Sequence, residues 1–307
     1  MALLRLIRLP NLLLLGLCQT ILAVLFVWPA LQSAGLPSVL YPATLSVLIL
    51  ATLCLAAAGY IFNDLQDLPT DRINRPDRPL PSGALRARQA RLWLGIFVLT
   101  GGVLAIAAAR MSGQWTQLWL YPAAGTGLYA YSARLKGRGL AGNLLIGLFC
   151  AAAAALPAWA EGRNLARLSG PPYRPFWVLT GAFLGFAFAL TVFRELVKDL
   201  EDQEGDRQQG YRTFPVQHGQ KAAKKLGLAI ALACGTTALL LPAVLGKHLA
   251  TWLWVTGCMG LPVPLFTVAR ALYRAENKIQ FHRLSQYIKL AMLAGIGTLC
   301  LFATSIL

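Results

Sequence analysis

Charged residues are scarce in this chain, and acidic residues are the scarcest. Asp, Glu, Lys and Arg together make up 13% of its 307 residues, whereas an ordinary soluble domain carries about 25%. Only 12 residues are acidic against 28 that are basic, and 57% of the chain is hydrophobic. This composition excludes an ordinary water-soluble fold and indicates an integral membrane protein.

The sequence also lacks the signatures of thiol, zinc and serine chemistry. Its six cysteines all lie in apolar segments without a Cys-x-x-Cys pair, and its three histidines are isolated from one another. No Gly-x-Ser-x-Gly motif occurs. We therefore expect no disulfide framework, no zinc site and no covalent nucleophile.

Long apolar runs, by contrast, recur to the end of the chain. A helix needs about 20 apolar residues to cross the hydrocarbon core, and nine segments reach or approach that length. They are residues 11–33, 39–63, 90–110, 115–133, 139–160, 176–196, 222–245, 248–270 and 286–306. The first has no clear small-residue cleavage site, so it is interpreted as a helix and not as a signal peptide. We predict an all-α polytopic membrane protein with nine transmembrane helices.

The basic residues set the expected orientation. With the N-terminus in the cytoplasm, 23 of the 28 Lys and Arg residues fall on the cytoplasmic side, which is the usual bias. Because they are divided among short loops, they are poor evidence for nucleic-acid binding. Eleven of the 12 acidic residues lie on that same side. Acidic residues contribute little to topology, so their clustering needs another cause.

The first acidic cluster lies in the stretch NDLQDLPTDRINRPDRPLPSG, directly behind the second apolar segment. Asp64, Asp67 and Asp71 have the spacing i, i+3, i+7, which places three carboxylates on one face of a helix. Three close carboxylates repel one another unless a cation lies among them. A metal site is the first functional expectation.

The residues that follow suit an anion. Pro69 cannot continue a regular helix, so the helix is expected to end or kink near Leu68 and Asp71 to be placed by loop geometry. The segment RPDRPLPSG is rich in proline and is expected to form a stiff lid. Arg75 and Arg78 in this segment, and Arg72 shortly before it, could bind phosphate.

A second cluster repeats the first. Asp199, Asp202 and Asp206 have the same spacing, and each lies 135 residues beyond its counterpart in the first triad. We therefore predict an internal pseudo-repeat, with helices 1–4 and 5–8 as its halves and helix 9 added, in a single domain of residues 1–307. Basic residues accompany this triad too: Lys198, Arg207 and Arg212.

Several residues allow two interpretations. Arg8 and Asn11 are either a topology signal with a helix cap or part of the polar site of Asp64. Tyr129 and Tyr131 either line the site or belong to the aromatic belt at the membrane interface. Asn143 begins an apolar helix, where its amide needs a polar partner.

Two acidic triads near basic residues suit a magnesium-bound phosphate compound. They could hold two or three Mg²⁺ ions, which prefer carboxylate oxygens and bridge to substrate phosphates. Lys136 is either one more topology charge or another phosphate contact. Because the polar stretches adjoin an apolar bundle, the expected ligand is a prenyl diphosphate. The expected chemistry is ionisation of its allylic C–O bond, with Mg²⁺ as Lewis acid, and attack by an acceptor.

The two motifs resemble those of the UbiA superfamily of intramembrane prenyltransferases. The first resembles its Asn-Asp-x-x-Asp-x-x-x-Asp motif followed by Arg-Pro-x-Arg-Pro, and KDLEDQEGDRQQGYRTFP resembles its second, although the family pattern usually has no proline at position 69. The resemblance covers nearly the whole chain and implies helices around a central cavity, with diphosphate bound between the motifs. It implies the metal-site residues Asn63, Asp64, Asp67, Asp71, Asp199, Asp202 and Asp206, of which Asp64, Asp67, Asp199 and Asp202 are the catalytic ones. It implies the diphosphate contacts Arg72, Lys136, Lys198 and Arg207.

Within that superfamily, the motifs are closest to those of digeranylgeranylglyceryl phosphate synthases and their bacterial relatives. The expected reaction is transfer of geranylgeranyl to geranylgeranylglyceryl phosphate, giving an ether lipid, with membrane lipid as the environment. An aromatic or chlorin acceptor and a terpene cyclase are alternatives on the same scaffold. A transporter is the non-enzymatic alternative, but transporters place their charged sites near the membrane midplane, whereas these carboxylates lie at helix ends.

Overall fold

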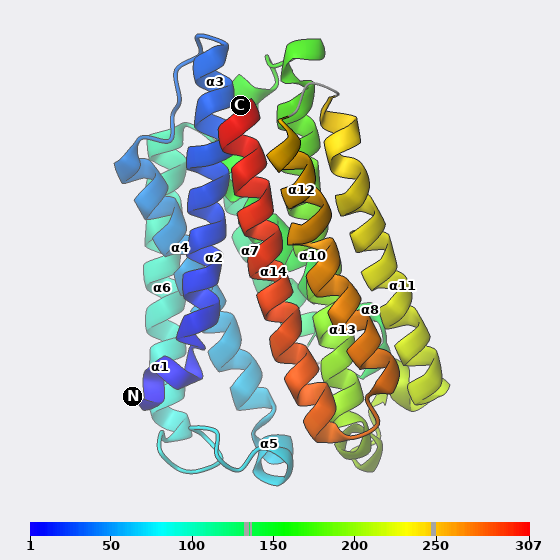
Figure 1. The fold of residues 1–307 in the computed structure, drawn as a ribbon. Coiled ribbons are helices and arrows are strands. Elements are labelled where there is room, and N and C mark those ends of the chain that lie inside the picture. Colours follow the sequence, from blue (N-terminus) through cyan, green and yellow to red (C-terminus); the bar gives the residue numbers. More distant parts are fainter. Residues whose placement is uncertain (132–134, 136, 247–249) are drawn as a thin grey trace. The chain divides into compact units, whose positions relative to one another are not determined.

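The computed structural model describes residues 1–131, 135, 137–246 and 250–307, without the side chains of residues 70, 73 and 74. The chain is almost wholly helical (Figure 1). In order, its elements are α1 (Ala2–Leu6), α2 (Leu9–Ile21), the π-helical η1 (Leu22–Val27), α3 (Trp28–Ser33), α4 (Pro42–Gln66), α5 (Leu68–Asn74), α6 (Ala87–Ser112), the 3₁₀ turn η2 (Trp115–Trp119), α7 (Leu120–Ala130), β1 (Arg138–Gly139), α8 (Ala141–Ala160), α9 (Gly162–Leu165), η4 (Pro171–Tyr173), α10 (Arg174–Gln208), β2 (Arg212–Thr213), α11 (Phe214–Leu245), α12 (Thr251–Gly260), α13 (Pro262–Arg274) and α14 (Lys278–Ile306).

Eight helical segments within the described residues are long and apolar enough to cross a membrane. They are Leu9–Ser33, Pro42–Gln66, Ala87–Ser112, Ala141–Ala160, Pro171–Gln208, Phe214–Leu245, Thr251–Arg274 and Lys278–Ile306. The all-α, polytopic membrane class is therefore confirmed. The fourth segment expected from the sequence, residues 115–133, contains η2 and α7 and extends beyond the described part. The count of nine helices stays a prediction, as does the cytoplasmic N-terminus.

The chain divides into two compact units. The first comprises Met1–Ala133 and Ala153–Leu168, and the second comprises Arg134–Ala152 and Ser169–Leu307. The division cuts α8, so its first part belongs to the second unit and its remainder to the first. Each polar stretch found in the sequence falls within one unit, the first in unit 1 and the second in unit 2.

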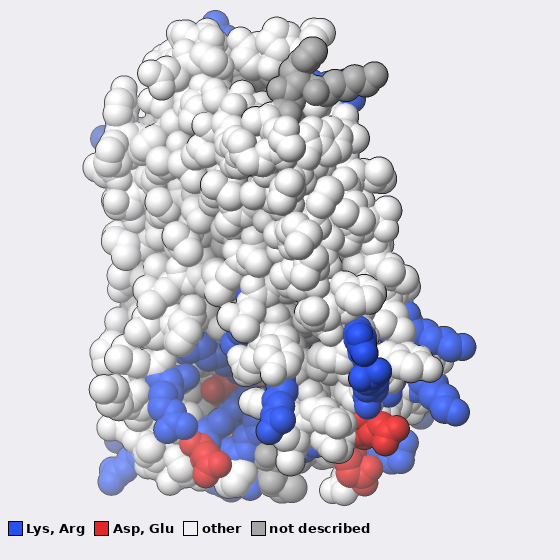
Figure 2. Space-filling model, viewed as in Figure 1, with Lys and Arg blue, Asp and Glu red and all other residues white. Residues whose placement is uncertain are grey.

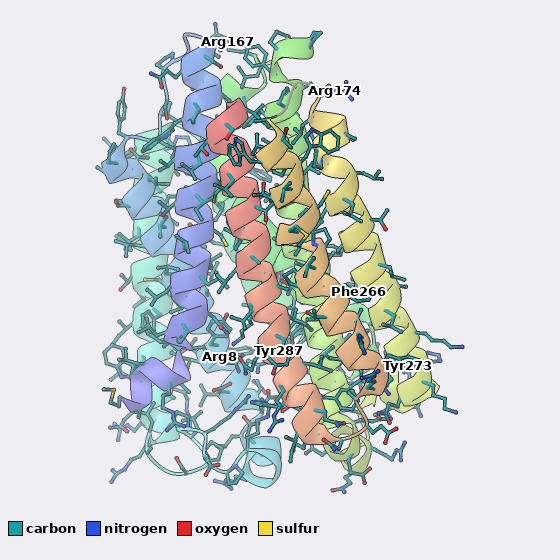
Figure 3. The ribbon with its side chains drawn as sticks, in the orientation of Figure 1. Arg8, Arg167, Arg174, Phe266, Tyr273 and Tyr287 are labelled. Atoms are coloured by element: carbon teal, nitrogen blue, oxygen red, sulfur yellow. The ribbon has the colours of Figure 1, made fainter. Side chains whose placement is uncertain are left out.

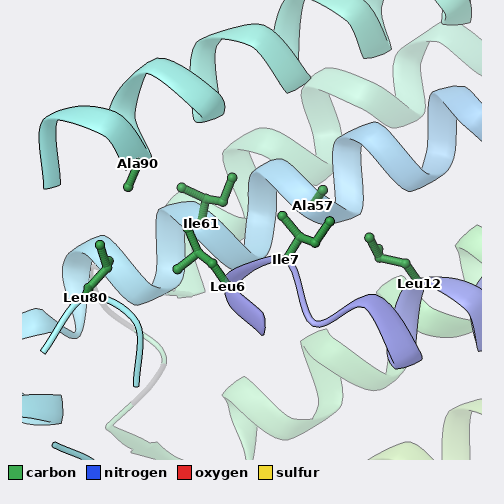
Figure 4. Close-up of a cluster of buried hydrophobic side chains, with 7 residues drawn as sticks. All are labelled: Leu6, Ile7, Leu12, Ala57, Ile61, Leu80 and Ala90. Carbon is green, nitrogen blue, oxygen red and sulfur yellow. The ribbon is translucent and has the colours of Figure 1, made fainter. Parts of the chain in front are cut away.

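A compact apolar cluster in unit 1 supports the first polar stretch. It joins α1 and α2 to the last turns of α4, the start of α6 and the loop between α5 and α6 (Figure 4). Its buried members are Leu6, Ile7, Leu12, Ala57, Ile61, Leu80 and Ala90. Because Ile61 lies one turn before Asp64, this packing fixes the end of α4 from which the carboxylates project.

Elsewhere in unit 1, a buried carboxylate fixes the connection between α3 and α4. Glu161 has an exposed fraction of 1%. It accepts hydrogen bonds from the backbone N–H groups of Val39 at 2.7 Å and Leu40 at 3.0 Å, from the Ser38 hydroxyl and from the Asn164 amide. These donors satisfy a charge that would otherwise be costly to bury.

In unit 2, α10 packs against α11 and α14, and its length carries it from an apolar core to the second acidic stretch. Close approach of α8 depends on Gly147, where an added Cβ would lie 2.7 Å from Cγ2 of Val192 and 3.1 Å from the Phe188 carbonyl oxygen. Small residues commonly permit such contacts between membrane helices.

Large apolar side chains on the surface agree with a lipid environment. Leu99 and Val103 in unit 1, and Leu232 and Phe266 in unit 2, are each at least 66% exposed, which is not expected of so many residues in water. Within unit 1, charged side chains gather at the end of that unit that contains α5 (Figure 1, Figure 2). Within unit 2, they gather at the end of that unit that contains the start of α14.

Candidate functional site

The first polar stretch keeps its three carboxylates buried in spite of a break in the helix. α4 ends at Gln66, and α5 begins at Leu68 with Pro69 in its first turn, so the predicted interruption is confirmed. The expectation that loop geometry places Asp71 was wrong, because Asp71 lies within α5. Its N–H donates to the Asp67 carbonyl at 2.7 Å, which places it one helical turn further on, since proline is tolerated in the first turn of a helix. Asp64, Asp67 and Asp71 are all buried, with exposed fractions of 5–6%.

Arg8 reaches this cluster from the N-terminal end of the chain. Its Nη2 donates to Oδ1 of Asp64 at 2.7 Å, and its guanidinium lies 4.8 Å from the centre of the Tyr60 ring. The side chain is labelled in Figure 3. Its backbone is in the left-handed region, with φ 52° and ψ 53°, between α1 and α2. This conformation costs a non-glycine residue about 1–2 kcal/mol, so the contacts of Arg8 must outweigh that cost.

Arg78 joins two members of the cluster. Its Nη1 lies 2.5 Å from Oδ2 of Asp71 and 3.6 Å from Oδ1 of Asp64. Burial raises the pKa of the Asp71 carboxyl; Arg78 opposes that rise, and the charges of Asp67 and Asp64 add to it. The segment that carries Arg78 consists of successive turns, and the Leu85 N–H closes it by donating to the Pro79 carbonyl at 2.9 Å.

A pocket of about 390 Å³ opens beside Asp64. Four arginines and one further aspartate share its lining with proline residues. The complete lining is Arg5, Arg8, Asp64, Arg75, Pro76, Asp77, Arg78 and Pro79. Four guanidinium groups against two carboxylates make this pocket suited to an anion.

Other residues singled out in the first unit are not part of this lining. Arg72 is exposed and Asn11 is half-buried, and neither lines the pocket. Tyr129 is 63% exposed, with its ring 6.5 Å from that of Phe62. Asn63 donates its amide to Oδ2 of Asp67 at 2.7 Å, so it orients that carboxylate. Tyr131 is half-buried.

In unit 2, the second polar stretch is organised around a hydrogen bond from α8 to α10. The Asn143 amide donates to Oδ2 of Asp199 at 2.8 Å, which is the polar partner that an amide at the start of an apolar helix requires. Asn143 lies one turn before Gly147, where α8 and α10 are in close contact. The contact therefore depends on that glycine.

Lys198 makes an ion pair that the sequence interpretation did not assign. Its Nζ lies 2.7 Å from Oε1 of Glu195, and Nη1 of Arg194 lies 3.3 Å from the same oxygen. The i, i+3 spacing of Glu195 and Lys198 was the signal that could have revealed the pair.

Asp206 closes the end of α10 onto the loop that follows. Its Oδ2 accepts a hydrogen bond from the Thr213 hydroxyl at 3.2 Å, and its carbonyl accepts from the Tyr211 N–H at 2.9 Å. Strands β1 and β2 pair in parallel here, with Arg138 opposite Arg212. The pair places two exposed arginines side by side.

The remaining described candidates of unit 2 differ in exposure. Asp202 is half-buried and Arg207 is exposed. Lys136 lies outside the described residues. Next to the triad, Oε1 of Glu201 lies 3.0 Å from Nδ1 of His282 on α14, a contact 81 residues apart that no local pattern could indicate.

Within the described part of the chain, no three His, Cys, Asp or Glu side chains are close enough together to form a metal-binding group. Four of the carboxylates instead have arginine or amide partners: Asp64, Asp67, Asp71 and Asp199. Asp64 and Asp71 do share the single cationic group of Arg78. These two buried carboxylates are thus the pair most suited to a shared cation in unit 1.

The described residues include eight apolar helical segments of spanning length, with buried carboxylates and arginines at helix ends, which is the arrangement of a polytopic membrane protein. The UbiA prenyltransferase family model matches residues 12–293. The chain therefore belongs to the UbiA prenyltransferase family, and it is a membrane prenyltransferase, as the two motifs predict.

Curated relatives and solved structures agree with this assignment. The chain is 32% identical to the digeranylgeranylglyceryl phosphate synthase of Methanopyrus kandleri over 257 residues, covering 83% of this chain and 84% of the relative. A solved digeranylgeranylglyceryl phosphate synthase structure matches with a TM-score of 0.68 and 22% identity, covering 99% of this chain and 98% of that one. A UbiA homologue of Archaeoglobus fulgidus, solved with DMAPP and Mg²⁺, matches with a TM-score of 0.60 and 18% identity over both complete chains. At these identities, the structures establish the common fold.

Proposed function

We propose that the chain transfers a geranylgeranyl group from its diphosphate to the hydroxyl of geranylgeranylglyceryl phosphate, forming an ether lipid within the membrane. The observation that carries this proposal is the pair of buried carboxylates, Asp64 and Asp71, that share Arg78 beside a pocket lined by four arginines. The name of the Methanopyrus kandleri relative, at 32% identity, supports the choice of acceptor.

A hard divalent cation fits the donors of both stretches. Carboxylate oxygens are the ligands that Mg²⁺ prefers, and Asp64 and Asp71 already share one cationic group. We assign two or three Mg²⁺ ions to the residues Asn63, Asp64, Asp67, Asp71, Asp199, Asp202 and Asp206. When bound, Mg²⁺ would neutralise the diphosphate and make it a better leaving group.

The chain's own residues bind and orient the diphosphate. Arginines are suited to phosphate because their planar guanidinium groups can donate two hydrogen bonds at once. We assign diphosphate binding to Arg72, Arg75, Arg78, Lys136, Lys198, Arg207 and Arg212. Arg8 holds Asp64, and Asn143 holds Asp199, so that both carboxylates keep a fixed direction. Tyr129, Tyr131 and Asn11 are assigned to the substrate pocket.

The reaction needs no covalent intermediate with the protein. The allylic C–O bond of the prenyl diphosphate breaks, and its electron pair leaves with the diphosphate. The acceptor hydroxyl oxygen then bonds to the allylic carbon and loses its proton to solvent. The four arginines of the first pocket would stabilise the negative charge that develops on the leaving group.

We further propose that residues 1–307 act as one domain, with both acidic triads required for one reaction on the cytoplasmic side. The 135-residue offset between the triads and the excess of basic residues in the expected cytoplasmic loops support this. Inactivating either triad alone should then abolish turnover.

A product assay tests the proposed function. The purified full chain in liposomes is incubated with geranylgeranyl diphosphate and Mg²⁺, together with geranylgeranylglyceryl phosphate, a phenolic acceptor or a chlorin acceptor. Mass spectrometry should detect the ether lipid in the first mixture, and EDTA should remove it. A prenylated phenol or chlorin in place of the ether lipid, or a cyclised product without any acceptor, would overturn the assigned reaction.

Matched variants test the assigned residues in the same assay. Asp64→Asn and Asp199→Asn each keep an acceptor oxygen for Arg8 and Asn143 but lose the charge, so turnover should fall at least about 100-fold. Glu204→Gln removes an exposed charge from the same helix as Asp199 and should leave turnover unchanged. Full activity in either aspartate variant would contradict the assignment of its triad.

A further inference from the structure

A second pocket lies in unit 2, between α13 and α14, and its lining includes no residue of the acidic stretch described above. Its volume is about 420 Å³. The two helices are consecutive and run side by side (Figure 1). Its lining is Thr267, Arg270, Ala271, Arg274, Ala275, Gln280, Arg283, Leu284 and Tyr287.

The helical spacing explains why these side chains meet. Thr267, Arg270 and Arg274 recur at intervals of three and four residues, so they share one face of α13. Arg283 and Tyr287 are four residues apart and share one face of α14. The pocket is thus formed by two matching polar faces at the adjoining ends of two otherwise apolar helices.

The pocket carries positive charge without an acidic counterpart. Three arginines and no Asp or Glu line it, and in the described part of the chain no ion pair involves Arg270, Arg274 or Arg283. The situation differs from the site in unit 1, where Arg8 and Arg78 are bound to buried aspartates. Three unpaired guanidinium groups around one cavity favour an anion.

The pocket also lies at the expected depth for a lipid headgroup. It occurs at the end of Thr251–Arg274 and the beginning of Lys278–Ile306, both long enough to span the membrane. On the same two helices, Phe266, Tyr273 and Tyr287 are more than 50% exposed. Figure 3 shows Tyr273 and Tyr287 near the end of unit 2 opposite Arg174. Exposed tyrosines mark the boundary between hydrocarbon and headgroups.

We propose that this pocket binds the phosphate group of a membrane lipid. Arginine side chains from both helices would donate to the phosphate oxygens, while the lipid chains would lie along the exposed apolar surface of α14, which includes Leu290 and Leu293. Arginines that served only to orient the chain in the membrane would extend into water independently of one another, whereas these three arginine side chains line a common cavity.

Two lipids could supply that phosphate. One is an anionic phospholipid of the bilayer. The other is the acceptor itself, and this source rests on the proposed function above. The contact between His282 and Glu201 ties the helix that carries Arg283 to the second acidic stretch, so an acceptor held here would be bound at the same end of unit 2.

The test uses the double variant Arg274→Gln/Arg283→Gln, which removes one charge from each helix. Its matched control is Arg88→Gln/Arg91→Gln, which removes two exposed charges from the start of α6. Native mass spectrometry measures retention of phosphatidylglycerol by the full chain. Steady-state kinetics measure KM for geranylgeranylglyceryl phosphate and for geranylgeranyl diphosphate.

We expect the pocket variant, but not the control, to lose affinity for a lipid phosphate by at least about tenfold, since each charge-assisted hydrogen bond contributes about that much. Weaker phosphatidylglycerol retention would identify a bilayer lipid, and a raised KM for the acceptor alone would identify the acceptor phosphate. The binding measurement remains informative even if no ether lipid is formed, so the two proposals fail separately. Phosphatidylglycerol retention and an acceptor KM that both match those of the control would overturn the lipid site. If the double variant does not fold, Arg270→Gln is measured in the same way.

Discussion

Replacing Gly147 with alanine should damage both packing and catalysis in unit 2. The new Cβ would lie 2.7 Å from Cγ2 of Val192, whereas ordinary contacts begin at 3.4 Å, so about 0.7 Å must be gained. Val192 is β-branched and has one strongly preferred rotamer in a helix, and the Phe188 carbonyl at 3.1 Å belongs to the backbone. The separation of α8 from α10 must therefore increase.

The size of that shift decides the expected effects. Overpacking of this kind costs about 1–3 kcal/mol of unfolding free energy. If the Asn143–Asp199 hydrogen bond lengthened from 2.8 Å by the same 0.7 Å, it would reach about 3.5 Å, where it is largely lost. If Asp199 serves in the metal site as proposed, misplacement of its carboxylate on this scale should lower turnover by about 10- to 100-fold.

Thermal unfolding in detergent and steady-state turnover measure the two effects together. Gly95→Ala on α6 is the control, because no atom lies within 4 Å of its added Cβ, and both quantities should stay near those of the unmodified chain. Val192→Ala should recover part of the activity in the Gly147→Ala background, since it removes the clashing methyl groups. Unchanged turnover in Gly147→Ala, with unchanged thermal stability, would refute the reasoning.

Three further substitutions test contacts in unit 1, each by the free energy of unfolding. Arg8→Gly should be more stable than Arg8→Ala by about 1 kcal/mol, because both lose the bond to Asp64 but only glycine tolerates the left-handed backbone; equal stabilities would show that the backbone is unstrained. Glu161→Gln should cost at least about 2 kcal/mol, since the charge that accepts four hydrogen bonds is lost and an amide nitrogen in place of Oε2 would face the Asn164 N–H donor. A neutral result would exclude the buried carboxylate as an anchor. Gly101→Ala should be destabilising, because its new Cβ would lie 3.1 Å from the Cβ of Cys54 on α4, whereas the new Cβ of Gly102→Ala would meet no atom within 4 Å. If Gly102→Ala were the less stable of the two variants, the packing of α4 on α6 would be contradicted.

Much of the site was predictable because its residues are close in sequence. The acidic triads follow helical spacing, and the break at Pro69 follows from the missing N–H of proline. The i, i+3 contact of Glu195 with Lys198 obeys the same local geometry, although its role was not assigned from sequence. Such features require only that the residues be placed on a helix.

Other parts of the site depend on contacts between distant segments. Arg8 meets Asp64 across 56 residues, and Asn143 meets Asp199 across 56 residues as well. A sequence pattern can show that an asparagine in an apolar helix needs a partner, but not which carboxylate accepts its hydrogen bond. The left-handed backbone of Arg8 likewise has no local signal, since it is sustained by its tertiary contacts.

The sequence by itself determined that this is an all-α membrane protein of the UbiA prenyltransferase family, because hydrophobic length, helical periodicity and motif spacing are local properties. Tertiary structure alone decided which charges are neutralised and which stay available. Arg78 is held by buried aspartates, whereas Arg274 and Arg283 face a common pocket without an acidic partner among the described residues. The difference arises from packing, because an arginine has the same charge in every loop and only its neighbours in space decide what that charge can bind.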